Sequence, residues 1–420
     1  MARVATVAST GPVETAPRRR GPDLPASGTL PAPPAHAADV SRVLARRIAD
    51  AIGRAGGWIG FDRYMQMALY EPGLGYYAAG SRKFGPGGDF VTAPELSALF
   101  GECLAGQCAH WFESTAASIV EFGAGSGALA VQLLAALHQL GATPDSYRIV
   151  ELSAQLRQRQ RELLAERVPA LLERVVWLDQ LPQRIEGVIV ANEVLDAMPV
   201  RMFRWRDDAV FERGVACVPG ADGFAFADRP ADEAFARRVR RALAQAWGDG
   251  DQPGGDYVSE IGEQGESWVE TVGARLERGA MLLVDYGFPR AEYFHPQRAT
   301  GTLQCHYRHR VHGDPFLWPG LQDITAHVDF TAVHRAARRA GLTPLGYNSQ
   351  ARFLLDCRLL DRLASRPRND ARQWARNAQA AQLLLSEAEM GELFKAIAFG
   401  REVPDDAPGF ATRDRRDALA

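Results

Sequence analysis

The feature that most constrains this chain is a loop of three glycines between an apolar strand pattern and an apolar helix pattern. The loop, Glu121-Phe122-Gly123-Ala124-Gly125-Ser126-Gly127, follows a strand predicted over 118–122 and precedes a helix predicted over 128–140. Glycines at such a junction let the backbone approach a ligand closely, at the carboxyl edge where doubly wound parallel sheets bind cofactors. The loop therefore predicts an α/β protein with a ligand site at this edge of its sheet.

Short apolar strands and helices keep alternating after the loop, as expected for a Rossmann-like parallel sheet. The pattern predicts strands over 147–152, 175–178, 187–191, 281–285 and 393–399, and crossover helices over 154–166 and 331–340. Two segments break the rhythm. One, 211–279, combines a hairpin pattern with a helix, and the other, 288–323, is rich in His, Pro and Gly. We interpret both as insertions that form walls of a substrate cleft.

The regions before and after the sheet differ from it in composition. Helices are predicted over 40–52, 61–70 and 95–112, and the glycine-rich stretch 75–94 is long enough to be a lid or binding loop. The predicted organisation is a Pro/Ala-rich disordered tail over 1–38, N-terminal helices and lid over 39–115, the core over 116–210 and 280–400, an insertion over 211–279, and a C-terminal tail over 401–420.

Composition excludes several classes of protein. The formal net charge of −3 gives no general argument for nucleic-acid binding, and no stretch has the ~20 apolar residues of a membrane span. Five scattered cysteines indicate reduced thiols, so we expect a cytoplasmic protein. Arg18-Arg19-Arg20 is compatible with a mitochondrial transit peptide, but prolines interrupt the amphipathic pattern that such peptides need. The mitochondrial matrix is therefore the second interpretation.

Carboxylates at the strand ends bear on the identity of the ligand. Glu121 lies two residues before the first glycine, where it would face a cationic group and would repel a pyrophosphate. Glu151 ends the next strand and could accept both ribose hydroxyls, a role that also exists in nicotinamide enzymes. Asp179 could reach an adenine or cap a helix, with even weight.

These residues favour S-adenosylmethionine as the cofactor, since its sulfonium is a cation and it carries no pyrophosphate. Gly123-x-Gly125-x-x-Ala128 also satisfies a permissive dinucleotide pattern, so a nicotinamide oxidoreductase stays as a minor alternative. The predicted cofactor site consists of Glu121, Gly123, Gly125, Gly127, Glu151 and Asp179.

An acidic turn, Asn192-Glu193-Val194-Leu195-Asp196, follows the apolar strand 187–191. Methyl transfer is an in-line displacement, so the protein mainly positions the acceptor, and a carboxylate here could hold a guanidinium by a bidentate pair. Asn192, Glu193 and Asp196 are therefore candidate catalytic residues. The alternative is that Asn192 and Asp196 cap the start of a helix.

The histidines near residue 309 have a weaker interpretation. Cys305, His306, His309 and His312 are ligands that suit zinc, but a spacing of three scatters them over both faces of a strand. Neighbouring Gly and Pro residues argue against a helix, so we expect no metal and a polar insertion with hydrogen-bonded histidines. His327 either orients an acceptor loop or satisfies a buried polar group, and the sequence does not separate the two.

Several blocks, in the same order, resemble the MidA-like methyltransferases, a family that includes a mitochondrial complex I assembly factor that methylates arginine. The blocks are Gly75-Tyr76-Tyr77, Gly88-Asp89-Phe90-Val91-Thr92-Ala93-Pro94-Glu95, Phe100-Gly101-Glu102, 121–127, 191–200, Asp285-Tyr286-Gly287, Gly301-Thr302-Leu303, 319–330 and Met390-Gly391-Glu392-Leu393-Phe394-Lys395. Departures are Ala93, where Ser is expected, Val194-Leu195, where an aromatic is common, and the His-rich stretch.

The resemblance implies a class I methyltransferase fold, S-adenosylmethionine as cofactor and a protein arginine as acceptor, with a respiratory-chain subunit as one candidate partner. It also implies that the Asp89–Glu95 loop folds over the site. Thr92, Pro94 and Glu95 then join the cofactor site, and Tyr76 and Asp89 join the acceptor site. The alternative function is a non-catalytic assembly factor that keeps the fold and binds a partner through its insertions; the sequence leaves oligomerisation open.

Overall fold

The computed structural model describes residues 30–78, 92–248 and 255–420. Asp89, most of the predicted lid loop and most of the predicted N-terminal tail lie outside these ranges. Within them, no helix combines the length and apolar character needed to cross a bilayer.

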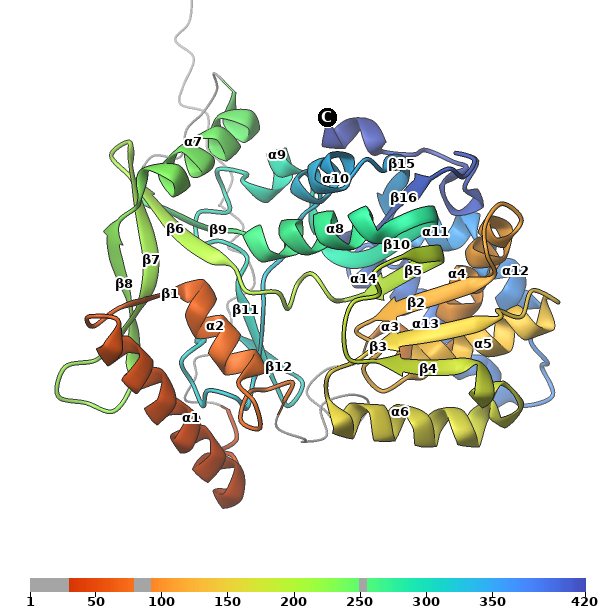
Figure 1. Cartoon of the computed structure of the whole chain (residues 1–420), viewed down its shortest axis with the longest axis horizontal. Coiled ribbons are helices and arrows are strands. Elements are labelled where there is room, and N and C mark those ends of the chain that lie inside the picture. The colour runs from red at the N-terminus through yellow and green to blue at the C-terminus, as the bar shows by residue number, and fades with distance from the viewer. Residues whose placement is uncertain (1–29, 79–91, 249–254) are drawn as a thin grey trace, which may run out of the picture.

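An eight-stranded sheet forms the larger half of the molecule, at the right of Figure 1. Its order is β15-β16-β10-β5-β2-β3-β4, with β14 beside the end of β10. Strand β16 runs antiparallel to the other strands on this path, which are parallel to one another. The strands are β2 (Ser118–Phe122), β3 (Ser146–Val150), β4 (Val175–Leu178), β5 (Ile185–Asn192), β10 (Leu276–Phe288), β14 (Val328–Asp329), β15 (Thr343–Ser349) and β16 (Phe394–Arg401).

Helices cover both faces of this sheet, which explains why its central strands read as continuous apolar runs. Because successive strand residues point to opposite faces, Ile119 joins one core cluster and Val120 the other. The first face packs against α3 (Ala93–Leu96), α4 (Ala98–Phe112), α5 (Ala128–Gln139), α6 (Ala154–Arg167), α11 (Gln350–Asp356), α12 (Leu359–Ala364) and α13 (Ala371–Leu385). The second face packs against α8 (Glu263–Arg275) and α10 (Phe330–Arg339), which run side by side in Figure 1.

A second lobe lies beside the carboxyl end of the main sheet, at the left of Figure 1. Its five-stranded sheet has the order β1-β7-β6-β9, with β8 paired to β7. A three-stranded sheet has the order β12-β11-β13. The elements are α1 (Ala35–Arg54), β1 (Ile59–Gly60), α2 (Phe61–Tyr70), β6 (Arg201–Arg206), β7 (Ala209–Cys217), β8 (Phe224–Pro230), α7 (Glu233–Trp247), β9 (Tyr257–Ile261), α9 (Arg290–Tyr293), β11 (Gln304–Tyr307), β12 (Arg310–His312) and β13 (Asp323–Thr325). Helix α14 (Met390–Leu393) belongs to the main-sheet half, where it packs against α11 and α13.

The structure moves the boundaries expected for the insertions. The five-stranded sheet begins at Arg201, ahead of the expected 211, and recruits Ile59–Gly60 from the N-terminal region by pairing with β7. Helix α8, inside the expected insertion 211–279, packs on the main sheet through Val269 and Val272. The second lobe is therefore assembled from three separate stretches of chain, which strand pairing over long sequence separations brings together.

The structure also differs from two further expectations, for the C-terminal tail and for the helix over 95–112. Residues 401–420, expected as a tail, pack on the molecule: Leu419 is buried and Arg415 N–H donates to the Tyr347 carbonyl at 2.8 Å. The helix expected over 95–112 is two helices, because the Ser97 side chain caps α4 by accepting the Leu99 N–H.

Candidate functional site

A cavity of about 1520 Å³ lies between the carboxyl edge of the main sheet and the second lobe. Strand β2 pairs with β3 on one side and β5 on the other, so the loops that follow β2 and β5 diverge. Such a switch point is where open α/β sheets bind ligands. Both loops, 123–126 and 192–194, line the cavity.

The glycine loop approaches the cavity in a conformation that disfavours side chains. Gly123, Gly125 and Gly127 have φ values of 68°, 52° and 88°. A Cβ on Gly123 would lie 2.5 Å from Cγ2 of Val194. Gly123 and Gly125 line the cavity, whereas Gly127 precedes α5 and packs against Gln160. The predicted loop thus reaches the ligand side through its first two glycines.

Glu121 lies at the base of this loop and lines the cavity, although its side chain is almost fully buried. The Tyr147 hydroxyl donates to its Oε2 at 2.7 Å. Burial raises the pKa of Glu121 to about 7, and the bond from Tyr147 opposes this shift. A cation in the cavity would favour the ionised form of such a carboxyl group.

Glu151 follows β3 and lines the same part of the cavity. It accepts the Ser153 N–H at 2.8 Å and the Gln160 amide at 3.2 Å. The buried Gln160 also donates to the Gly125 carbonyl at 3.0 Å and accepts from Trp177 Nε1 at 2.8 Å. Gln160 therefore ties the glycine loop to Glu151, a role that its position in a polar helix gave no reason to expect.

Thr92, Pro94 and Glu95 line the cavity beside the glycine loop. Ser126 Oγ donates to Glu95, and the Gln132 amide donates to the Pro94 carbonyl at 2.6 Å. Helix α3 is thereby docked on the start of α5, which brings these three predicted residues to the cavity.

Asn192, Glu193 and Asp196 line the cavity farther along the sheet edge. Glu193 has a φ of 53°, so the chain turns sharply after β5. Oδ2 of Asp285, on the adjacent β10, accepts the N–H groups of Val194, Leu195 and Asp196 at 3.2, 2.9 and 3.3 Å. Asp285 was not among the predicted site residues, although an acid that follows the apolar residues 281–284 is a local signal for such a role.

Burial perturbs the acids of this turn. Asn192 Nδ2 donates to Glu193 at 2.9 Å, yet burial, with repulsion from Asp196, raises the pKa of Glu193 to about 8. Burial likewise raises the pKa of Asp196 to about 6. Asp323 from β13 also lines the cavity and accepts from the Tyr77 hydroxyl at 3.0 Å. The three carboxyl groups of Glu193, Asp196 and Asp323 form an acid cluster.

Besides Gly127, the predicted residues Tyr76 and Asp179 do not line the cavity. Tyr76 is buried behind Tyr77, with ring centroids 5.1 Å apart, and Tyr77 lines the cavity instead. Tyr76 and Tyr77 are adjacent in a turn, so a difference of one position decides which of the two rings faces the cavity. Asp179 is exposed after β4 and is not part of the cavity wall.

The His-rich segment forms the β11–β12 hairpin, whose turn places Arg308 and His309 at positive φ. Alternation sends Cys305 and the opposing His312 into the interior and His306 into the cavity wall. Among the described residues, no group of three or more His, Cys, Asp or Glu side chains is arranged to hold a metal ion.

The sheet order, the glycine loop at the switch point and the carboxyl groups beside it define a class I S-adenosylmethionine-dependent methyltransferase. The chain belongs to a family described as "Putative S-adenosyl-L-methionine-dependent methyltransferase", whose model matches residues 103–348. The resemblance to MidA-like methyltransferases is thereby confirmed, together with the cofactor that it implied.

Curated relatives carry more specific names. "Protein arginine methyltransferase NDUFAF7, mitochondrial" of Danio rerio is 30% identical over 372 residues, which covers 81% of this chain and 83% of the relative. The protein of the same name in Homo sapiens is 30% identical over 381 residues, with 81% and 80% covered.

Solved structures agree on the whole fold. A Burkholderia thailandensis protein bound to S-adenosyl-homocysteine superposes with a TM-score of 0.88 at 50% identity, covering 93% of this chain and 100% of that one. A native structure of a protein from the same organism gives a TM-score of 0.86 with the same identity and coverage.

Proposed function

We propose that this methyltransferase acts on an arginine side chain of a partner protein. The observation that carries the proposal is the acid cluster of Glu193, Asp196 and Asp323 in the wall of the cavity. Burial raises the pKa values of Glu193 and Asp196, and repulsion from Asp196 and Asp323 raises that of Glu193 further. A planar guanidinium relieves this repulsion, because it offers several N–H donors and a permanent positive charge.

The other end of the cavity suits the cofactor. Bound S-adenosylmethionine supplies an electrophilic methyl group on a sulfonium. Glu121 lies where it would face the cationic part, and Glu151 where it would accept the ribose hydroxyls. Thr92, Pro94 and Glu95 would cover the cofactor from the α3 side.

The residues of the acid cluster would orient the acceptor nitrogen and take its proton. Methylation forms an N–C bond, breaks the S–C bond and releases one proton from the guanidinium. Glu193 is suited to receive it, since a carboxyl group with a pKa near 8 holds a proton at neutral pH. Binding of the cationic guanidinium first releases the resting proton of Glu193 to water and leaves a carboxylate. That carboxylate then takes the proton that methylation releases, which restores the protonated resting form.

The relatives' names support a protein substrate, and a respiratory-chain subunit is one candidate. A cytoplasmic, bacterial-type location is supported by the 50% identity with a bacterial protein and by five free cysteines, whereas the animal relatives are named as mitochondrial.

Labelled methyl transfer tests the proposal. Purified protein is incubated with S-adenosylmethionine carrying a deuterated methyl group and with an extract of cells that lack the gene, and the labelled residue is located by mass spectrometry. We expect label on arginine, lost in Asp323→Asn and Glu193→Gln and kept in Asp179→Asn, whose side chain lies off the cavity. Label on another residue type contradicts the arginine acceptor. No label, with cofactor bound and partner assembly intact, would favour the assembly factor.

A further inference from the structure

A second cavity, of about 790 Å³, adjoins the site on the side of α7, α8 and α10. Glu263 and Met198 line both cavities. The wall between them includes an edge-to-face contact of Tyr286, which faces the first cavity, with His327, which faces the second. A chain segment bound near the acid cluster therefore has a neighbouring hollow within reach.

The second cavity is strongly basic. Seven arginines and four carboxylates line it. The arginines are Arg201, Arg237, Arg238, Arg241, Arg290, Arg335 and Arg339. Positive charge thus exceeds negative charge by three in its wall, although the chain as a whole has a net charge of −3. This contrast favours an anionic occupant.

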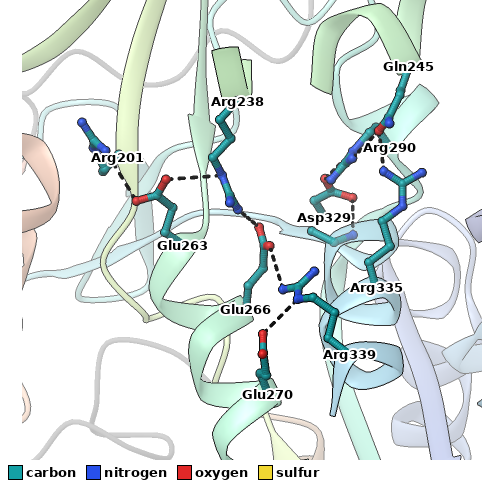
Figure 2. A network of polar contacts seen from close by, with 11 residues as sticks. Arg201, Arg238, Gln245, Glu263, Glu266, Glu270, Arg290, Asp329, Arg335 and Arg339 are labelled. Atoms are coloured by element: carbon teal, nitrogen blue, oxygen red, sulfur yellow. Dashed lines mark hydrogen bonds and ion pairs between the residues drawn. The ribbon is translucent and has the colours of Figure 1, made fainter. Parts of the chain in front are cut away.

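Most of these arginines belong to an ion-pair network that joins the second lobe to the main sheet, as Figure 2 shows. Arg290 donates to Asp329 at 2.7 and 2.9 Å. The other pairs are Arg201 with Glu212, Asp232 and Glu263, Arg238 with Glu263 and Glu266, Arg339 with Glu266 and Glu270, and Arg237 with Glu233. These guanidinium groups already have counter-ions.

Arg335 and Arg241 differ from the rest. Arg335, on α10, is half-buried and donates to the neutral amide of Gln245, and Figure 2 shows that Arg290 reaches the same amide. Burial and repulsion from Arg290 and Arg241 lower the pKa of Arg335. Arg241, on α7, has no hydrogen-bond or ion-pair partner among the residues that the structure describes. Asp329 and Glu266 attract Arg335 from farther away, but neither guanidinium group forms an ion pair with a described carboxylate.

His327 adds an independent unsatisfied group to the same cavity. Its side-chain nitrogens are buried, and within the described part of the chain neither has a hydrogen-bond partner. Burial lowers the pKa of His327 to about 3, so the ring is neutral and has one N–H to donate. Because buried polar groups are almost always satisfied, the His327 N–H is suited to donate to a ligand group in this cavity.

We propose that the second cavity binds an acidic side chain of the substrate protein, between Arg241 and Arg335, close in sequence to the methylated residue. The inference rests on the proposed function for its substrate, since it assumes a protein chain in the first cavity. The shared wall residues Glu263 and Met198 make the two cavities neighbours, which suits nearby positions of one bound segment. The enzyme would thus select an arginine that has an acidic neighbour.

Three labelled peptides test the proposal by fluorescence anisotropy with S-adenosyl-homocysteine present. The first has a central arginine with glutamates on both sides, the second has glutamines in place of the glutamates, and the third keeps the glutamates but replaces the arginine by glutamine. We expect the first peptide to bind at least about fivefold more tightly than the second. This is the gain expected when its glutamates form two partly exposed ion pairs with Arg241 and Arg335. In R241Q/R335Q that ratio should fall to about one.

R240Q/R338Q is the matched control. It removes the same charge from the same two helices, at exposed positions outside the cavity. The control should keep the preference for the glutamate peptide; an equal loss in both double variants would mean non-specific attraction and would overturn the proposal. Melting temperatures of both variants, with the cofactor product bound, check that they fold.

The remaining outcomes separate this inference from the proposed function. Equal wild-type affinity for the first two peptides overturns it, and so does stabilisation by inorganic phosphate alone that depends on Arg241 and Arg335. In one outcome the third peptide binds through Arg241 and Arg335, but neither of the first two peptides becomes methylated. This outcome supports the basic cavity and rejects arginine as the methyl acceptor.

Discussion

Asp285 holds the backbone of Leu195: its Oδ2 accepts the Leu195 N–H at 2.9 Å across the boundary between β10 and β5. The same oxygen accepts the N–H groups of Val194 and Asp196, and Oδ1 accepts that of Tyr286 at 2.8 Å. One carboxyl group thus fixes the turn in which Glu193 has a left-handed backbone conformation. The orientation of the acid cluster depends on a residue that contributes nothing to the cavity wall itself.

Asp285→Asn should therefore lower turnover without removing the cofactor. An amide nitrogen must face backbone N–H donors on one side, so at least one of these bonds is lost, at a cost of about 1–3 kcal/mol in stability. We expect turnover to fall roughly 100-fold, because small displacements of positioning groups have effects of that order. Calorimetric titration with S-adenosyl-homocysteine should give a near-normal Kd. Glu277→Gln, at an exposed position of the same strand, is the control and should leave turnover unchanged.

Glu193→Gln should change how stability depends on pH. Burial raises the pKa of Glu193 from about 4.5 to about 8, so the folded chain binds a proton that the unfolded chain releases. Stability is then fully present below pH 4.5 and is lost as pH rises through 8. Glutamine carries no charge and avoids this loss.

We expect Glu193→Gln to melt a few degrees above the wild type at pH 9 and to melt with it near pH 5. Activity should be lost at both pH values, since glutamine neither pairs with a cation nor takes a proton. Scanning calorimetry across this range measures the difference. A melting curve parallel to that of the wild type at every pH would contradict the assignment of a raised pKa to this residue.

Glu121→Gln should weaken binding of S-adenosylmethionine by about tenfold or more, because a buried carboxylate beside a sulfonium is lost. The loss should be smaller for S-adenosyl-homocysteine, whose thioether is neutral. Fluorescence or calorimetric titration with both ligands measures this difference. Asp179→Asn, exposed and off the cavity, should bind both ligands as the wild type does; a comparable loss there would restore Asp179 as a contact of the adenine.

Gly123→Ala and Gly141→Ala form a matched pair. Both glycines have positive φ, 68° and 72°, so each substitution carries backbone strain of about 1 kcal/mol. A Cβ on Gly141 meets nothing within 4 Å, whereas one on Gly123 meets Val194 of the acidic turn at 2.5 Å. We therefore expect similar melting temperatures but an affinity for S-adenosyl-homocysteine at least about tenfold weaker in Gly123→Ala alone. Equal affinities would show that the turn yields to the added methyl group.

Local patterns were sufficient for the elements that surround the cofactor. The apolar run 118–122, the glycines at 123, 125 and 127 and the apolar helix 128–140 act over a few residues, and the structure has these elements at nearly the same bounds. Strand 175–178 also coincides with β4, and the helix expected within 211–279 is present as α7. Periodicity and glycine chemistry depend on near neighbours, which the sequence contains directly.

Elements whose partners are distant in sequence were not predictable in this way. The pairing of β1 with β7 joins residues 59–60 to residues 214–215, and no local pattern encodes that contact. The β11–β12 hairpin was not predicted, because its turn has Arg308 and His309 at positive φ, where glycine or asparagine is usual.

The sequence alone determined that this chain builds a Rossmann-like methyltransferase with acids at the ends of β2, β3 and β5, since strand-ending acids and glycine turns are local. Tertiary structure decided which side chains share one cavity. It placed Tyr77 rather than Tyr76 in the wall and added Asp323 to Glu193 and Asp196. It also placed Arg241 and Arg335, which have no carboxylate in an ion pair among the described residues, in the adjoining cavity. The physical reason is that burial, pKa and charge pairing depend on neighbours in space, which chain topology brings together from opposite ends of the sequence.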